Sequence, residues 1–209
     1  IKLLNCLPST LEHFAFASSY SVYGVPRELP ITEETNPHPE NVYSFSKLVT
    51  EQYLTMYQNV KNNLPIAKLR ISSVYGPGAK KENYNRAIPN MIETVLSGNP
   101  PYVCGDGTTF RDYLYIDDCI HAIVNVLKLK SNGVFNIASA AGTSVKEIAQ
   151  EIIDISGLVC KIDYRYDMDS EWNWLCDTTK MKNELNYVPS VTISDGIRLT
   201  YEWHKRNRV

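Results

Sequence analysis

The sequence has no long apolar run, no strong charge excess and no pair of closely spaced cysteines. No stretch approaches the roughly 18 apolar residues of a membrane-spanning helix. The 21 basic and 23 acidic residues leave a net charge of −2 at pH 7. Such a balance produces no broad attraction to nucleic acid or to an anionic membrane. We therefore expect neither nucleic acid nor a membrane among its partners.

Signatures of metal sites and disulfide frameworks are also missing. The five cysteines are scattered, with no Cys-x-x-Cys pair: Cys6, Cys104, Cys119, Cys160 and Cys176. The four histidines do not cluster. We expect no metal, and reduced thiols packed within the protein. The amino terminus carries no basic region followed by an apolar stretch and a cleavage site, so we expect no secretory signal and a cytoplasmic location.

The remaining pattern alternates short apolar runs with amphipathic segments. A chain of 209 residues usually forms one domain, or one and a small second. Strands are expected at 13–18, 66–74, 110–115, 134–138 and 161–166, and a short strand with a hairpin turn at 101–108. Helices are expected at 41–62, 86–97, 117–129, 145–156 (capped by Thr143 or Ser144 with Glu147), after Asp177 and at 194–207, with a helical tail at 1–6 and a proline-rich surface loop at 24–40. This alternation indicates an α/β protein.

Three side chains form a candidate catalytic group. Residues 14–19 read as a buried strand that ends in the hydroxyl of Ser19. Tyr43 and Lys47 are four apart and share one helix face. An ammonium beside a phenol favours the phenolate, which can take a proton from an alcohol during hydride transfer. The alternatives are a helix-surface pair for Tyr43 and Lys47 and a backbone-capping hydroxyl for Ser19.

Five sequence blocks occur in one order along the chain. They are Ser-Ser-Tyr-Ser-Val-Tyr-Gly at 18–24, Tyr-x-x-x-Lys at 43–47, Leu-Arg-x-x-x-Val-Tyr-Gly-Pro at 69–77, Gly-Asp-Gly-x-x-x-Arg-Asp-Tyr at 105–113 and Asp-Asp at 117–118. Together they resemble the extended short-chain dehydrogenase/reductase family, the NAD-dependent nucleotide-sugar epimerases and dehydratases of the UDP-glucose 4-epimerase kind. The resemblance covers essentially the whole chain.

The resemblance implies an α/β fold: the C-terminal part of a doubly wound Rossmann-type parallel sheet plus a small α/β substrate domain. Residues 1–75 would be the remaining half of the NAD-binding domain, with later returns near 110–140. Residues 76–209 would mostly bind substrate.

One family feature is missing from this sequence. The family begins with a strand, a Gly-x-x-Gly-x-x-Gly turn and a helix that seats the cofactor pyrophosphate. The ten glycines here include none in that spacing. We expect roughly the first hundred residues of a full-length relative to be missing, judged from the size of a half-fold. Without those residues the parallel sheet would have an open edge. We therefore expect one of three situations: a fragment of a longer protein, a partner that fills the gap, or a rearranged oligomer.

The resemblance also implies roles for the candidate catalytic group. Tyr43 as phenolate takes the proton of a sugar hydroxyl while NAD accepts the hydride, and Lys47 contacts the nicotinamide ribose. Ser19 hydrogen-bonds the reacting oxygen. Ser18, with Tyr43 and Lys47, is expected to contact the cofactor.

Four further residues are expected to bind substrate by the same resemblance. Arg111 matches the arginine that holds the nucleotide diphosphate, since a guanidinium makes two parallel hydrogen bonds to phosphate; its alternative is a surface salt bridge with Asp112. Ser73 stands where relatives often carry asparagine, and it can also bond a diphosphate. Tyr102 and Val103 are placed to flank the nucleobase, with core packing an equally good alternative.

Tyr20 and Ser21 indicate which reaction of the family to expect. Dehydratase relatives carry an Asp-Glu pair at these two positions, and neither residue here can supply that acid and base. We expect epimerisation of a nucleotide sugar, most simply a UDP-sugar, through a transient keto-sugar. The alternatives are a truncated, inactive fragment that acts as a substrate-binding or dimerisation module, and a reductase, decarboxylase or dehydratase. Relatives dimerise through the helix at 41–62, so we expect a homodimer. Arg165 is out of register with the family's second phosphate-binding arginine and receives no role.

Overall fold

The computed structural model describes residues 6–8, 10–60, 64–78, 87–166 and 172–207. Residues 1–5 of the expected helical tail lie outside the described residues. The strands are β1 (Phe14–Ser19), β2 (Ile66–Ile71), β3 (Ser73–Tyr75), β4 (Tyr102–Cys104), β5 (Phe110–Tyr115), β6 (Gly133–Ile137), β7 (Gly142–Ser144) and β8 (Asp163–Arg165). The helices are the 3-10 turn η1 (Tyr20–Tyr23) and α2 (Val42–Val60), α3 (Ala87–Leu96), α4 (Ile116–Leu129), α5 (Val145–Ser156), α6 (Thr179–Leu185) and α7 (Ile193–Arg206). The expected α/β class is confirmed.

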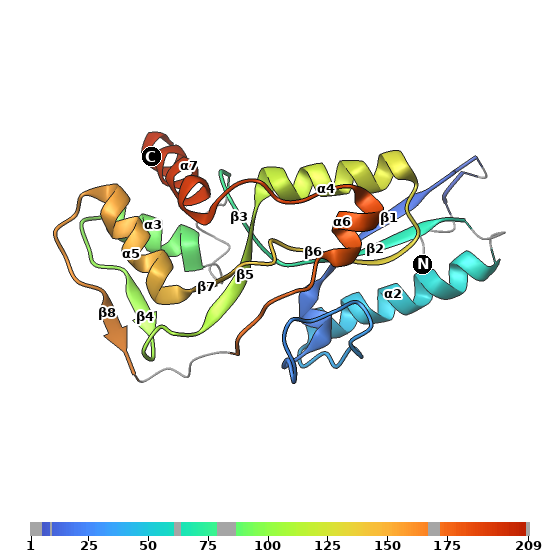
Figure 1. Ribbon diagram of the computed structural model, residues 1–209, viewed down its shortest axis with the longest axis horizontal. Coiled ribbons are helices and arrows are strands. Elements are labelled where there is room, and N and C mark those ends of the chain that lie inside the picture. The colour runs from blue at the N-terminus through green and yellow to red at the C-terminus, as the bar shows by residue number, and fades with distance from the viewer. Residues whose placement is uncertain (1–5, 9, 61–63, 79–86, 167–171, 208–209) are drawn as a thin grey trace.

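A three-stranded parallel sheet forms one lobe, in the order β1-β2-β6. Helix α2 covers one face and α4 with α6 the other (Figure 1). The central strand β2 is buried along nearly its whole length, and its side chains alternate between the two faces. Ala67 and Leu69 pack against α4 and α6, whereas Ile66 packs with Leu54 of α2. Coverage of both faces is what a parallel sheet requires.

The other lobe surrounds a second apolar core. The three-stranded sheet β3-β5-β7 and the two-stranded sheet β4-β8 pack with α3, α5 and α7, which lie together on the left in Figure 1. Ile92 of α3, Ile148 and Ile152 of α5 and Ile197 of α7 are fully buried in this cluster. Both lobes therefore have cores of their own. The division into a cofactor half at 1–75 and a substrate half at 76–209 stays a prediction.

The single strand expected at 66–74 is wrong in detail. The chain breaks at Ser72, and β2 and β3 join different sheets. The amide of Ser72 still donates to the carbonyl of Ile137 in β6 at 2.9 Å, after which the chain pairs with β5. Val74 and the buried Tyr75 continue the apolar pattern past Ser72, so the sequence does not mark the break.

The hairpin expected after residue 104 is also wrong. Strand β4 pairs in parallel with β8, which comes some sixty residues later, as in the pairing of Tyr102 with Asp163. The amide of Gly105 donates to the carbonyl of Arg165 at 2.8 Å. The hairpin prediction made the next strand in the sequence the partner of β4. The actual partner, β8, comes from a distant part of the chain.

The proline-rich loop at 24–40 is not entirely at the surface. Ile31 is 1% exposed, and it follows a cis peptide bond between Leu29 and Pro30. Its amide donates to the carbonyl of Leu175 at 2.8 Å, in an isolated bridge with Cys176. The loop therefore ties the segment before α6 to the lobe that carries β1.

The helix start expected near residue 145 is confirmed, with Ser144 rather than Thr143 as the cap. The hydroxyl of Ser144 accepts from the amide of Glu147 at 3.3 Å, and Oε2 of Glu147 accepts from the amide of Ser144 at 2.8 Å. This reciprocal pair is a capping box.

Within the described residues, no helix has the length and apolar character to cross a membrane, and no group of side chains could hold a metal ion. The described cysteines form no disulfide.

Candidate active site

A cleft of about 830 Å³ lies where the end of β1, the break between β2 and β3, the first turns of α2 and the strands β4 and β5 come together. Ligand sites in open α/β sheets lie at the carboxyl ends of the strands, as this cleft does. All eight residues proposed from the sequence line it: Ser18, Ser19, Tyr43, Lys47, Ser73, Tyr102, Val103 and Arg111. Residues up to 93 positions apart are thus brought to one cavity.

Ser19 ends β1 and begins η1. Its backbone is extended, with φ −143° and ψ 144°, and its Oγ accepts from the amide of Ser21 at 3.2 Å. The same Oγ lies 2.9 Å from the hydroxyl of Ser21. The capping contact considered as an alternative therefore exists, and Ser19 lines the cleft as well.

Tyr43 and Lys47 occupy the first two turns of α2. Asn41 caps this helix, because its Oδ1 accepts from the amide of Ser44 at 2.9 Å. The Tyr43 ring is 57% exposed, and Nζ of Lys47 lies 5.5 Å from its centre. That Nζ also donates to the carbonyl of Ala17 in β1 at 2.7 Å. The ammonium is thus held to the strand that carries Ser19 while it lies beside the phenol.

A buried ionic network lies directly behind these residues. Arg70 of β2 donates to Glu51 of α2 through Nη2 at 2.8 Å and through Nε at 3.2 Å, and both side chains are 5% exposed. The hydroxyl of Ser18 also donates to Glu51. The side chain of Ser18 is therefore bound to Glu51 in this network. The expected contact of Ser18 with a cofactor stays a prediction.

Sequence reasoning missed this network, although a signal was present. Lys68 and Arg70 are two cations in an otherwise buried strand, and both point toward α2. Glu51 lies one turn beyond Lys47 on the same helix. Burial raises the energy of a charge unless a partner compensates it, so cations in a buried strand call for an acid nearby.

Another part of the cleft wall is built around Arg111. Its Nη1 donates to the phenol oxygen of Tyr20 at 3.4 Å, and that oxygen lies 2.8 Å from Oγ of Ser73. The carboxylate of Asp112 is fully buried and accepts from the amides of Ser139 at 2.7 Å, of Ala140 at 3.0 Å and of Cys176 at 3.3 Å. Asp112 thus joins β5 to the segment at 139–140 and to the segment at Cys176.

Tyr102 and Val103 differ in their surroundings. Val103 is 1% exposed and packs in the core of its lobe, so the core-packing alternative describes its side chain. The guanidinium of Arg165 lies 4.0 Å from the centre of the Tyr102 ring, in cation–π contact, and pairs with Asp163 at 3.0 Å. The sequence motifs gave no reason to place Arg165 at the cleft. The pairing of β8 with β4 brings it beside Tyr102.

The charge of the cleft is positive. Lys47 and Arg111 are the two charged side chains among the described residues that line it, and no carboxylate lines it within that set. The chain as a whole carries −2. Such a local excess of positive charge favours an anionic ligand.

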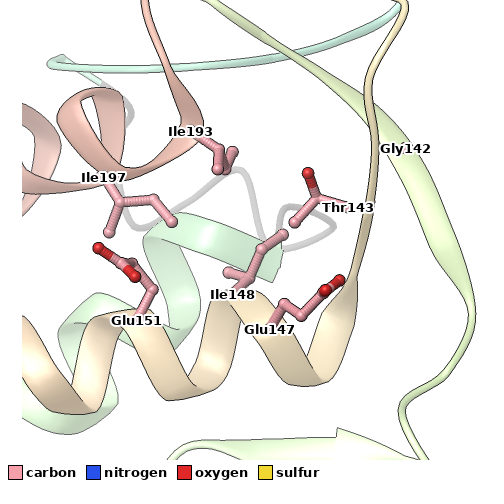
Figure 2. A pocket seen from close by; sticks show the side chains of 7 residues that line it. All are labelled: Gly142, Thr143, Glu147, Ile148, Glu151, Ile193 and Ile197. Atoms are coloured by element: carbon pink, nitrogen blue, oxygen red, sulfur yellow. The ribbon is translucent and has the colours of Figure 1, made fainter.

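A second, smaller cavity of about 210 Å³ lies between α5 and α7 (Figure 2). Its two acids already have structural partners. Glu147 belongs to the capping box, and Glu151 accepts from the hydroxyl of Ser194. Isoleucines form most of the remaining wall, so we assign this cavity no chemistry.

Comparison with known proteins agrees with the motif order. The model of the NAD dependent epimerase/dehydratase family matches residues 2–138. The chain belongs to this family. The resemblance stated from the sequence is therefore confirmed, and with it the expectation that the family's cofactor is NAD.

Curated and solved relatives are similar over nearly the whole chain. A UDP-glucose 4-epimerase of Lactobacillus helveticus is 30% identical, covering 98% of this chain and 68% of the relative. The structure of a UDP-glucose 4-epimerase of Thermotoga maritima with UDP-glucose is 29% identical with a TM-score of 0.86, covering 94% of this chain and 64% of that one. The structure of a UDP-glucuronic acid 4-epimerase of Bacillus cereus with UDP-glucuronic acid and NAD is 31% identical with a TM-score of 0.86, covering 98% and 65%.

The chain thus spans about two thirds of the length of these proteins. Other curated relatives are named as a dTDP-glucose 4,6-dehydratase and as a decarboxylase of a UDP-N-acetyl-glucosaminuronate. The comparisons therefore establish the family, while several reactions occur within it.

Proposed function

We propose that this chain carries the catalytic and substrate-binding residues of an NAD-dependent nucleotide-sugar epimerase that acts on a UDP-sugar. The observation that carries this proposal is the cleft itself. Ser19, Tyr43, Lys47 and Arg111 all line it, with no carboxylate among its described lining. Relatives named as UDP-sugar 4-epimerases support the substrate class.

In this proposal Tyr43 takes the proton of the sugar hydroxyl that is oxidised, and later returns it. The ammonium of Lys47 lies beside the phenol and is held there by its hydrogen bond to the carbonyl of Ala17. Lys47 would also contact the nicotinamide ribose. Ser19 donates a hydrogen bond to the reacting oxygen. NAD, when bound, supplies a reversible hydride acceptor. Tyr43, Lys47 and the backbone at Ser18 are the cofactor contacts that this chain offers.

The diphosphate would lie beside Arg111. Arg111 can bind it with two parallel hydrogen bonds, and Ser73 adds a hydroxyl. Tyr102 would face the nucleobase, backed by the cation–π contact of Arg165. Val103 is buried, so it would contribute through its backbone.

Epimerisation is favoured over dehydration by the side chains next to Ser19. Tyr20 and Ser21 both line the cleft, and both carry hydroxyls. Elimination of water needs an acid and a base in addition to Tyr43, and no carboxylate lines the cleft among the described residues to supply them.

We also propose a homodimer, formed through α2. Five exposed apolar side chains recur along this helix at intervals of three, four and seven residues, which places them on one side: Val42, Phe45, Val49, Met56 and Val60. A stripe of this kind marks an interaction surface. Sedimentation should show a dimer that Val49→Glu dissociates, with Thr50→Glu at a partly exposed position outside the stripe as control; a monomeric wild type would refute the proposal.

The enzymatic proposal is tested with the chain itself. Calorimetry should detect binding of NAD and of UDP-glucose, and a coupled assay should detect epimerised product. Tyr43→Phe should lower turnover about 10²- to 10⁴-fold, the usual contribution of a general base, with UDP-glucose affinity retained. The exposed Tyr166→Phe is the matched control. Absence of NAD binding up to millimolar concentration would leave the inactive substrate-binding or dimerisation module instead.

A further inference from the structure

Tyr20 forms a fixed part of the cleft wall directly after Ser19. Its side chain is 8% exposed, and its ring lies 4.6 Å from the ring of Trp174, centre to centre, at an angle of 59°. Trp174 is itself 8% exposed. Two buried rings in tilted contact leave little room for rotation, so the phenol oxygen has a defined position.

The two hydrogen-bond partners of that oxygen can both act as donors. Arg111 can only donate, and its Nη1 lies 3.4 Å from the phenol oxygen. Oγ of Ser73, at 2.8 Å, can donate as well. When both donate, they fill the two lone pairs of the Tyr20 oxygen. The Tyr20 proton then has to find an acceptor elsewhere, and the residue lines the cleft.

A second phenol in the same wall lacks a partner. The hydroxyl of Tyr113 is buried with no hydrogen-bond partner in the described structure, and Tyr113 also lines the cleft. Burial is the main cause that raises the pKa of Tyr113 to about 12, against the lowering effect of the Arg111 charge. A buried hydroxyl without a partner beside a guanidinium indicates a missing acceptor.

We propose that Tyr20 is a substrate-binding residue whose phenol donates a hydrogen bond to the diphosphate that Arg111 holds. Phosphate oxygens only accept, so they complement the available proton of Tyr20 and the unpartnered hydroxyl of Tyr113. In this arrangement Ser73 gives its own proton to Tyr20, so the phenol takes the place of the Ser73 hydroxyl as the donor to the diphosphate. This inference rests on the proposed function, because it needs a nucleotide sugar in the cleft.

The test removes one oxygen atom and keeps the ring. Wild type, Tyr20→Phe and the exposed control Tyr166→Phe are titrated with UDP and with uridine by calorimetry. A hydrogen bond to a charged group contributes about 1.5–3 kcal/mol. Tyr20→Phe should therefore bind UDP about 10- to 100-fold more weakly. Uridine affinity should not change, since uridine has no phosphate. Tyr20→Met, which also lacks the hydroxyl, replaces the first variant if that is insoluble.

The outcomes separate this inference from the proposed function. A wild type that binds neither UDP nor UDP-glucose would refute both. A wild type that binds UDP, with Tyr20→Phe binding it equally well, would overturn only the role of Tyr20. Equal weakening of UDP and uridine would also overturn it, because Tyr20 would then act through the packing of the wall. Selective loss of UDP affinity would support the contact.

Discussion

Removal of Glu51 should reveal how strongly the buried network stabilises the fold behind the cleft. Glu51 accepts three hydrogen bonds from Arg70 and one from Ser18, and it joins α2 to β1 and β2. In Glu51→Ala the Arg70 guanidinium would stay buried. Its Nη1 already has no hydrogen-bond partner, and its remaining contact with Tyr23 is through the ring face at 4.6 Å.

The expected loss is large because a buried charge would be left without compensation. Breaking a buried pair by removing one partner costs about 3–5 kcal/mol. For a chain of this length each kcal/mol lowers the melting temperature by about 2–4 °C, so the fall should be about 6–20 °C. Urea unfolding followed by tryptophan fluorescence measures the free energy directly, through Trp172, Trp174 and Trp203.

Two further variants test the cause. Glu51→Met with Arg70→Met removes both charges and should recover most of the loss, since apolar replacements of buried pairs are often neutral. Glu202→Ala breaks the exposed pair with Arg206, whose charged atoms lie 3.8 Å apart. That change should cost less than about 1 kcal/mol. A Glu51→Ala variant that loses no more stability than Glu202→Ala would refute the reasoning.

Two other changes have a definite sign. Burial raises the pKa of Glu33, so the folded state disfavours its ionised form. Stability from this group is therefore lost as pH rises above the ordinary value of 4.5. Glu33→Gln should stabilise the chain at pH 7 relative to wild type and much less at pH 4, in urea unfolding at both pH values; an equal effect at both would contradict this. Gly196→Ala should destabilise α7 by about 1–3 kcal/mol despite the better helix propensity of alanine. A Cβ there would lie 2.1 Å from the hydroxyl oxygen of Tyr75. A raised urea midpoint would contradict this steric argument.

Much of the fold was predictable because its signals are local. The helices at 42–60 and 145–156 follow from apolar spacing and capping residues, which act within one or two turns. The strand that ends at Ser19 follows from an apolar run that stops at hydroxyls. The motifs also identified eight residues that line one cleft, because each motif lies at an element end where parallel strands converge.

The errors share one physical origin. Pairing of β4 with β8 and the transfer of the chain from one sheet to another at Ser72 depend on backbone partners far away in the sequence. The residues of a single apolar run do not specify which strand pairs with it. The sequence also left Val103 between a nucleobase contact and core packing, and its side chain is buried in the core.

The sequence by itself determined the α/β class, the family and the identity of the candidate catalytic residues, because these follow from residue type and short spacing. Only the tertiary structure decided what those residues touch. It committed the hydroxyl of Ser18 to Glu51, fixed Lys47 to the carbonyl of Ala17 and set Tyr20 between Ser73 and Arg111. Hydrogen bonds act over about 3 Å. Which donor meets which acceptor is therefore settled by packing in space and not by order along the chain.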